Sequence, residues 1–246
     1  MSKPVATGKL LTLDRGNSAL KADLWEGNMI VETVVMAPST LVRQLRALLK
    51  HQDIKGAMYC SVTDDGEQIK ELFDEARVPF RRFSLADCAP LTIGYQSPQT
   101  LGVDRVAACL GAVTLFPGKE LLVIDLGTAI TYDRVSKDAH FIGGNIAPGV
   151  SLRLKSLNAF TARLPKVELE GPVPGWGYDT DTALRSGSIR GIAAEVSYYQ
   201  SLLPADSRVV LTGGSVLRIT PYLDFQYALE PHLVSIGLKA CLDKFI

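Results

Sequence analysis

A short motif occurs twice in this chain, and each copy has the form of a strand that ends in Asp-x-Gly. In the first copy, Asp14-Arg15-Gly16-Asn17-Ser18 follows an apolar segment, and in the second, Asp125-Leu126-Gly127-Thr128-Ala129 does. A returning strand is predicted directly after each copy, at residues 19–25 and 130–135. Because a strand, a tight glycine turn and a returning strand form a β-hairpin, the sequence predicts two similar hairpins.

These hairpins have the chemistry of a phosphate site. Glycine at the turn allows a positive φ and lets a ligand approach the backbone closely. Free N–H groups at such a turn, with hydroxyl side chains beside them, form a cradle for an anion. A carboxylate at the strand end can hold a metal ion or orient a water molecule. Two such hairpins that face each other would bind a polyphosphate from both sides.

Composition places the chain among ordinary globular proteins. Its 246 residues carry 26 Lys and Arg and 26 Asp and Glu, so the net charge of zero gives no reason to expect nucleic-acid or membrane binding. The four cysteines are far apart and form no CxxC pair. No apolar stretch reaches the ~20 residues of a membrane span, and the N-terminus lacks a signal-like apolar region. We therefore expect a cytoplasmic protein.

The order of predicted elements is similar in the two halves of the chain. After each hairpin the pattern predicts a third strand, then helices and a further strand, which favours a parallel continuation of the sheet. Pro117-Gly118 interrupts the chain just before the second hairpin, so we expect an N-terminal half at 1–116 and a C-terminal half at 117–246. The predicted strands are 29–35, 57–62, 140–146 and 208–211, and the predicted helices include 40–50, 66–76, 103–115 and 231–243.

Two similar α/β halves with facing hairpins point to one fold class. They indicate a duplicated actin-like (ribonuclease H-like) ATPase fold, with two similar halves and a cleft between them. The chain contains no GxxxxGK[ST] motif, so any use of ATP must depend on the paired hairpins.

The segment Gly102-Val103-Asp104-Arg105 opens a predicted helix and has two interpretations. An Asp at a helix start is often only a cap. It can also be a base, because the neighbouring arginine favours an ionised carboxylate that can take a proton from an alcohol. Tyr95, in the loop just upstream, supplies an aromatic ring with a hydroxyl, which suits a small-molecule pocket. Arg105 could bind a substrate carboxylate or phosphate.

Three further segments are ambiguous in the same way. Gly143-Gly144, followed by Pro148-Gly149, forms either a tight strand-to-helix turn or a backbone surface kept clear for a ligand. Thr212-Gly213-Gly214 follows a strand and could let a flat adenine ring lie against bare backbone. Thr180 opens a long helix, where a cap from Thr180 or Asp181 needs no function, although a hydroxyl there could also meet a substrate.

Taken in order, these motifs resemble the type III pantothenate kinase family over nearly the whole chain. The resemblance depends on the two hairpin motifs, on Lys21, and on Tyr95 followed by the 102–105 segment. Gly143-Gly144 with Pro148-Gly149 also agrees with the family in order and spacing, as does Thr180 before Ala183-Leu184 and Ser186-Gly187. The ordered set is much more specific than any single member.

The resemblance implies an activity and a set of roles. It implies transfer of the ATP γ-phosphoryl group to the primary hydroxyl of pantothenate, the first step of coenzyme A synthesis, with Asp104 as the general base. It implies Mg²⁺ with ATP, K⁺ or NH₄⁺ as a monovalent cation, and a homodimer with the active site near the subunit interface. The implied ATP-binding residues are Asp14, Arg15, Gly16, Asn17, Ser18, Ala19, Leu20, Lys21 and Thr128. The implied pantothenate-binding residues are Tyr95, Gly102, Val103, Asp104, Arg105 and Thr180. Asp125 is the implied ligand of the monovalent cation, and Asp14 would organise the phosphates through Mg²⁺.

The sequence departs from the commonest family pattern at two positions. Ser18 replaces threonine and keeps the hydroxyl, whereas Arg15 replaces a small apolar residue. Because neighbouring residues of a strand alternate between its faces, we expect Arg15 to point away from the phosphates. Two alternatives stay open: a kinase of another small polar metabolite, and a non-catalytic nucleotide-binding regulator.

Overall fold

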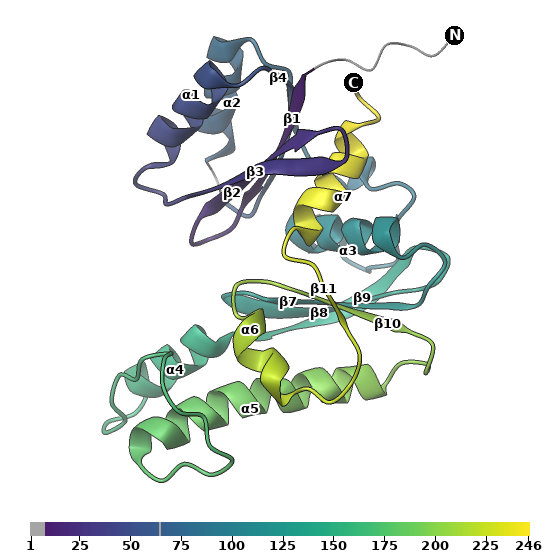
Figure 1. The fold of residues 1–246 in the computed structure, drawn as a ribbon. Coiled ribbons are helices and arrows are strands. Elements are labelled where there is room, and N and C mark those ends of the chain that lie inside the picture. The colour runs from purple at the N-terminus through teal and green to yellow at the C-terminus, as the bar shows by residue number, and fades with distance from the viewer. Residues whose placement is uncertain (1–7, 64) are drawn as a thin grey trace. The chain divides into compact units, whose positions relative to one another are not determined.

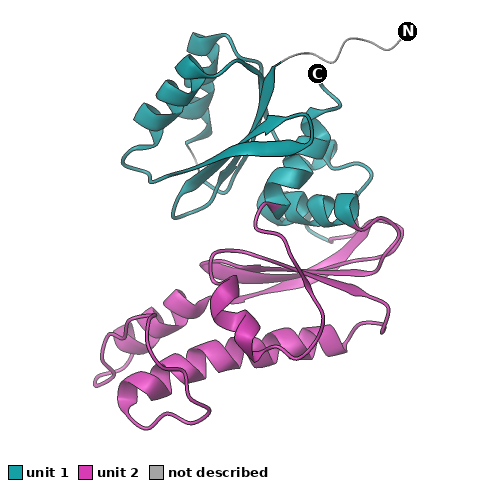
Figure 2. Cartoon of the chain, viewed as in Figure 1, with its two compact units in different colours: residues 1–92, 96–115, 233–246 teal, residues 93–95, 116–232 magenta. Residues whose placement is uncertain are grey.

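The computed structural model describes residues 8–63 and 65–246 (Figure 1). The chain divides into two compact units, drawn in different colours in Figure 2. Unit 1 comprises residues 1–92, 96–115 and 233–246, and unit 2 comprises residues 93–95 and 116–232.

Unit 1 is built on a five-stranded sheet with the order β3-β2-β1-β4-β5. Strands β1 and β2 form the first hairpin and β3 extends it, with antiparallel pairing throughout. Strand β4 then pairs parallel to β1, and β5 pairs parallel to β4. The strands are β1 (Lys9–Arg15), β2 (Leu20–Glu26), β3 (Met29–Met36), β4 (Ile54–Ser61) and β5 (Phe80–Arg82).

The helices of unit 1 form two pairs. Helices α1 (Leu41–His51) and α2 (Gly66–Ala76) lie side by side in Figure 1, and their apolar side chains enter the core cluster of the sheet. Helices α3 (Val103–Leu115) and α7 (Leu233–Leu242) pack against each other and against β4. Two short 3₁₀ turns, Leu85–Asp87 and Pro98–Thr100, lie in the segment before α3.

Unit 2 repeats the topology of unit 1. Its six-stranded sheet has the order β11-β10-β7-β8-β9-β6, so β7, β8, β9, β10 and β11 take the places of β1 to β5. Pairing is again antiparallel from β7 to β8 to β9 and parallel from β7 to β10 to β11. The strands are β6 (Thr92–Ile93), β7 (Leu121–Leu126), β8 (Ala129–Val135), β9 (His140–Pro148), β10 (Arg208–Thr212) and β11 (Ala228–Leu229).

Three helices supply the apolar side chains that complete the core of unit 2. They are α4 (Val150–Ala159), the long α5 (Thr180–Ser201) and α6 (Val216–Ile219), which is followed by a 3₁₀ turn at Thr220–Tyr222. Among the described residues, no helix combines the length and the apolar character needed to cross a bilayer.

The predicted duplication is confirmed, since both hairpins and the parallel strand that follows each of them are present. The two units do not follow a division at 116/117, because residues 93–95 belong to unit 2, and α7, at the C-terminal end of the chain, belongs to unit 1. Backbone contact explains this placement: a Cβ on Gly111 of α3 would lie 2.1 Å from the Leu233 carbonyl oxygen, and one on Gly237 of α7 would lie 2.0 Å from that of Ala107. Only glycine at both positions lets the two helices approach so closely.

Candidate active site

The first hairpin places Asp14 at the end of β1, opposite Lys21 of β2 and Cys60 of β4. Asp14 and Lys21 are half-buried, and Asn17 and Ser18 in the loop are exposed. Leu20 is completely buried, so its side chain belongs to the core and only its backbone can serve a ligand. The hairpin therefore presents a carboxylate, an ammonium group and a loop with a hydroxyl at one edge of the sheet.

A network of side chains fixes the end of β1. The guanidinium of Arg15 donates a hydrogen bond from Nε to Asp65 Oδ2 at 2.7 Å and another from an NH₂ group to the Gly16 carbonyl. Asp65 Oδ1 accepts from the Tyr59 hydroxyl at 2.6 Å and from Thr63 Oγ1 at 2.7 Å. Arg15 is buried, and its ion pair with Asp65 anchors the first loop to the start of α2.

The network changes the titration of its members. Burial raises the pKa of Asp65, but the hydrogen bonds from Tyr59, Thr63 and Arg15 favour the carboxylate more strongly, so its pKa is lowered overall. Burial and the hydrogen bond to Asp65 raise the pKa of Tyr59 to about 12. Arg15, the unusual residue of the first motif, is thus a structural cation whose partner is Asp65.

Asp104 lies in the first turn of α3. The Gly102 carbonyl accepts a hydrogen bond from the Val106 N–H at 3.3 Å, so Gly102 stands at the helix start. The Asp104 carboxylate accepts from the Arg105 N–H at 2.9 Å. A Cβ on Gly102 would lie 2.5 Å from Asp104 Oδ1, so any side chain at Gly102 would displace the carboxylate. Asp104 is half-buried, whereas Arg105 is buried.

Asp14 and Asp104 both raise the pKa of one group in unit 1, the thiol of Cys60. Burial is the largest cause of the raised pKa of the Cys60 thiol, and the negative charges of Asp14 and then Asp104 raise it further. Cys60 is opposite Asp14 in the β1–β4 ladder, and α3 packs against β4. The two carboxylates predicted to bind phosphate and to accept the proton therefore lie within electrostatic range of the same sulfur atom.

The second hairpin places Asp125 near the end of β7, between Thr131 of β8 and Thr212 of β10. Gly213 follows β10 with a φ of +98°, and a Cβ there would lie 2.4 Å from Asp125 Oδ1. The Ser215 N–H donates to the Leu126 carbonyl at 2.9 Å. The Thr-Gly-Gly segment thus packs its bare backbone against the strand end that carries Asp125.

The glycine turns differ from expectation in one detail. Among the described residues, positive φ occurs at five glycines, and neither Gly16 nor Gly127 is one of them. Close approach explains Gly127 instead, because a Cβ on it would lie 3.3 Å from Asp125 Oδ1 and 3.2 Å from the Ala129 carbonyl.

Gly149 joins the second hairpin to α4. Its N–H donates to the Thr128 carbonyl at 2.9 Å, and a Cβ on it would lie only 2.2 Å from the Gly127 carbonyl oxygen. One turn further on, Arg153 Nε donates to the Pro148 carbonyl at 2.8 Å. The same guanidinium bonds both carboxylate oxygens of Glu195 at 2.8 and 2.6 Å, which anchors this turn to α5. The loop that carries Thr128 is thereby held against the end of β9.

The remaining predicted residues of unit 2 lie at the starts of elements. Asp179 caps α5 by accepting from the Thr182 N–H at 2.8 Å, so the suggested cap by Thr180 or Asp181 is wrong. Thr180 is exposed in the first turn of that helix. Tyr95 is half-buried, with its ring 6.0 Å from that of Phe141 in an edge-on arrangement.

The sequence of the chain matches a known family over most of its length. The family model described as type III pantothenate kinase matches residues 10–201. A type III pantothenate kinase of Bacteroides fragilis is 36% identical over 95% of this chain and 97% of its own length, and one of Phocaeicola vulgatus is 37% identical with the same coverage. The chain belongs to the type III pantothenate kinase family.

Solved structures support the duplicated actin-like fold of this family member. A putative 2-dehydro-3-deoxygalactonokinase from Sinorhizobium meliloti superposes with a TM-score of 0.61, covering 96% of this chain and 99% of that one, at 12% identity. At that identity the likeness concerns the fold alone. It agrees with the expectation of a sugar-kinase-like architecture with one hairpin in each half.

The carboxylates of this pantothenate kinase family member suit a metal ion that binds together with a nucleotide. Within residues 8–63 and 65–246, no three or more His, Cys, Asp or Glu side chains form a group that could hold a metal ion by themselves. Mg²⁺ at nucleotide sites commonly takes one or two carboxylates and completes its shell with phosphates and waters. The single carboxylate of the first hairpin, Asp14, fits that mode of binding.

Sequence reasoning missed the residues that support the two hairpins. Asp65, Tyr59 and Thr63 were not singled out, nor were Arg153 and Glu195. A partial signal exists for Arg15 alone, since a cation at the end of a buried strand requires an acid nearby. No local pattern indicates which acid it is, because Asp65 follows Arg15 by fifty residues.

Proposed function

We propose that this protein transfers the γ-phosphoryl group of ATP to the primary hydroxyl of pantothenate. The observation that carries the proposal is family membership over residues 10–201, with relatives of matching length. The two hairpins with their strand-end carboxylates support it, because a phosphoryl-transfer site must position phosphates and compensate their charge.

We propose the following roles. Residues 14–21 and Thr128 bind the phosphates of ATP, with Asp14 acting together with Mg²⁺. A monovalent cation, K⁺ or NH₄⁺, takes Asp125 as a ligand. When bound, these cations offset the negative charge of the transferring phosphoryl group.

Asp104 is the proposed general base. Its carboxylate would accept the hydroxyl proton of pantothenate as the oxygen attacks phosphorus. The hydrogen bond from the Arg105 N–H orients that carboxylate, and the absence of a side chain at Gly102 leaves room for it. Tyr95, Arg105 and Thr180 would orient pantothenate, and the backbone of Gly102 and Val103 would line its site.

We further propose a homodimer in the cytoplasm, in keeping with the family resemblance. The two alternative functions receive less support. A kinase of another metabolite would use the same hairpins, and only its substrate would differ. A non-catalytic regulator would have no need for Asp14, Asp104 and Asp125 together.

An ADP-release assay tests the proposal. The purified chain is mixed with ATP, Mg²⁺ and K⁺, and ADP release is followed with pantothenate, with other primary alcohols, and with no acceptor. We expect release only with pantothenate, and phosphorus NMR should show a phosphomonoester product. Release with a different alcohol would favour another metabolite kinase, and nucleotide binding without turnover would favour a regulator.

A further inference from the structure

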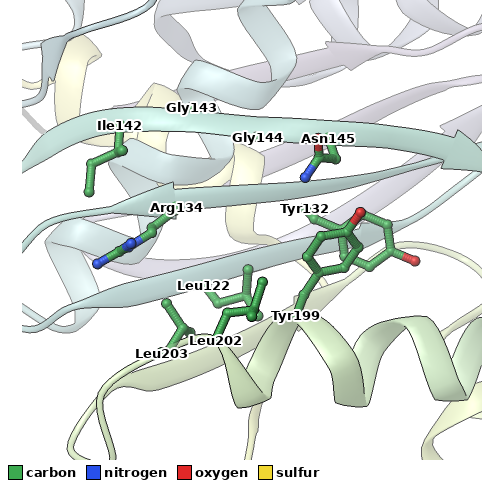
Figure 3. A pocket seen from close by; sticks show the side chains of 10 residues that line it. All are labelled: Leu122, Tyr132, Arg134, Ile142, Gly143, Gly144, Asn145, Tyr199, Leu202 and Leu203. Carbon is green, nitrogen blue, oxygen red and sulfur yellow. The ribbon is translucent and has the colours of Figure 1, made fainter.

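A cavity of about 200 Å³ lies in unit 2, between the sheet and the C-terminal end of α5 (Figure 3). Its walls come from β7, β8, β9 and α5 and the residues that follow α5, all within residues 122–203. None of the residues proposed above to bind ATP, pantothenate or a cation lines it. The cavity is thus a separate feature of this unit.

Two glycines of β9, Gly143 and Gly144, line the cavity and contribute no side chain to its wall. Gly143 is opposite Arg134 in the β8–β9 ladder, and Gly144 is its neighbour on β9. A Cβ on Gly143 would meet no atom within 4 Å. Gly143 therefore borders an open volume, and the glycine pair that was ambiguous in the sequence lines the cavity.

The walls have an apolar part and a cationic end. The rings of Tyr132 and Tyr199 lie 4.3 Å apart at one end, and Leu122 lies beside them (Figure 3). Arg134 lies at the other end and is the one charged side chain in the lining, which includes no carboxylate. The chemistry of the walls therefore matches an apolar body that carries a negative group.

The Arg134 guanidinium is only partly neutralised by the protein. It forms an ion pair with Glu120 at 3.4 Å, where the two side chains are 43% and 21% exposed. Its Nε is buried, and nothing within residues 8–63 and 65–246 accepts a hydrogen bond from it. Because a buried donor without an acceptor is unfavourable, a small adjustment of the guanidinium toward a bound carboxylate would be stabilising.

We propose that this cavity binds a small organic acid with one aromatic ring or a similarly flat apolar body. The carboxylate would pair with Arg134, and the ring would lie against the half-buried Tyr199, which packs on the buried Tyr132. The volume is below the roughly 300–1,000 Å³ of sites for drug-sized ligands, which limits the occupant to a single ring. The absence of acidic lining residues selects against a cationic ligand. This site is independent of the kinase chemistry and goes beyond it.

Protein-observed NMR with benzoate as the probe tests the proposal, and it needs no nucleotide. Benzamide serves as the neutral probe of equal size. We expect saturable benzoate shifts at Leu122, Tyr132 and Tyr199, with a dissociation constant on the order of 1 mM, as suits so small a ligand. Benzamide should bind at least about tenfold more weakly, because it lacks the charge that pairs with Arg134.

Matched variants assign the binding to the cavity. Arg134→Met should weaken benzoate binding about tenfold or more, whereas Arg134→Lys, which keeps the charge, should retain part of it. Arg208→Met is the control, because Arg208 is an exposed arginine of the same unit that does not line the cavity. The proposal is overturned if benzoate and benzamide bind equally, if Arg134→Met binds like the unaltered protein, or if no saturable shift appears at the lining residues.

Discussion

The two hairpins share one topology but are held in place by different means. In unit 1 the strand end is held by side chains, through the bonds of Arg15 and Tyr59 to Asp65. In unit 2 the corresponding end is in close contact with backbone, where a Cβ on Gly149 or Gly213 would collide with the hairpin, and the Arg153–Glu195 pair anchors the adjoining turn. The contacts in unit 1 are made to an ionised side chain, that of Asp65, so their strength depends on charge. The glycine contacts in unit 2 are made by backbone atoms, so they require only that no side chain is present at the glycines.

This difference explains why the first motif tolerates an unusual residue. Arg15 replaces a small residue of the family pattern, and Asp65 is present to receive its charge. In the second motif the residue at the position of Arg15 is Leu126, which is completely buried, and the neighbouring Gly127 lies against Asp125 and Gly149. We therefore expect the first hairpin to be sensitive to charge and pH, and the second to be sensitive to any added carbon atom.

The largest effect is expected at Asp104 of unit 1, the proposed general base. Asp104→Asn should lower kcat about 10²- to 10⁴-fold, the usual contribution of general base catalysis, with little change in thermal stability. Steady-state kinetics with pantothenate and ATP measure this. Asp74→Asn, on the exposed side of α2, is the control and should leave kcat unchanged. A near-normal rate for Asp104→Asn would mean that this carboxylate only caps α3.

The second prediction concerns the backbone contact of unit 2. Gly149→Ala should reduce the free energy of unfolding by about 1–3 kcal/mol, because its Cβ would meet a carbonyl oxygen that cannot move freely. It should also raise the KM for ATP, since Thr128 would shift. Gly175→Ala is the matched control, because a Cβ there meets nothing within 4 Å. Equal unfolding curves for the two variants would contradict the proposed packing.

The third prediction tests the side-chain network of unit 1. Arg15→Met removes the buried cation that pairs with the half-buried Asp65 and should cost about 1–3 kcal/mol in chemical denaturation. The same substitution at Arg46, whose ion pair with Glu75 is exposed, should cost less than about 1 kcal/mol. If the two variants lose the same stability, Arg15 is not a structural cation.

The smallest effect is expected in the pH dependence of stability. The pKa of Asp65 is lower in the folded than in the unfolded chain, so the stabilisation that it provides is present above its unfolded pKa, near 4. That stabilisation is lost as the pH falls through the folded pKa. Between pH 6 and pH 3, urea denaturation should show a steeper loss for the unaltered protein than for Asp65→Asn. Asp138→Asn, in an exposed loop, should follow the unaltered protein.

The sequence was sufficient to predict the repeated elements because each half carries its own local signals. The Asp-x-Gly turns and the alternation of apolar strands and helices predicted both hairpins and the parallel strand next to each. The short strand β5 was missed, since three residues carry too little periodicity. The cap at Asp179 was missed as well, because Asp179, Thr180, Asp181 and Thr182 are all plausible caps in sequence.

The contacts that hold the hairpins could not be predicted from sequence. Asp65 reaches Arg15 only because β4 pairs parallel to β1 and leads into α2. The need for glycine at Gly149 depends on where the carbonyl of Gly127 points, and that is fixed by the hairpin turn. Such contacts join distant parts of the chain and leave no local pattern.

We propose that both hairpins bind one nucleotide while Asp104 accepts the proton of the acceptor alcohol. A crystal structure with a non-hydrolysable ATP analogue, Mg²⁺ and pantothenate tests it most directly. We predict that the Asp14 and Asp125 hairpins contact the same triphosphate, and that the Asp104 carboxylate lies within hydrogen-bond distance of the pantothenate hydroxyl. A nucleotide bound to one hairpin alone, or a pantothenate hydroxyl remote from Asp104, would contradict the account.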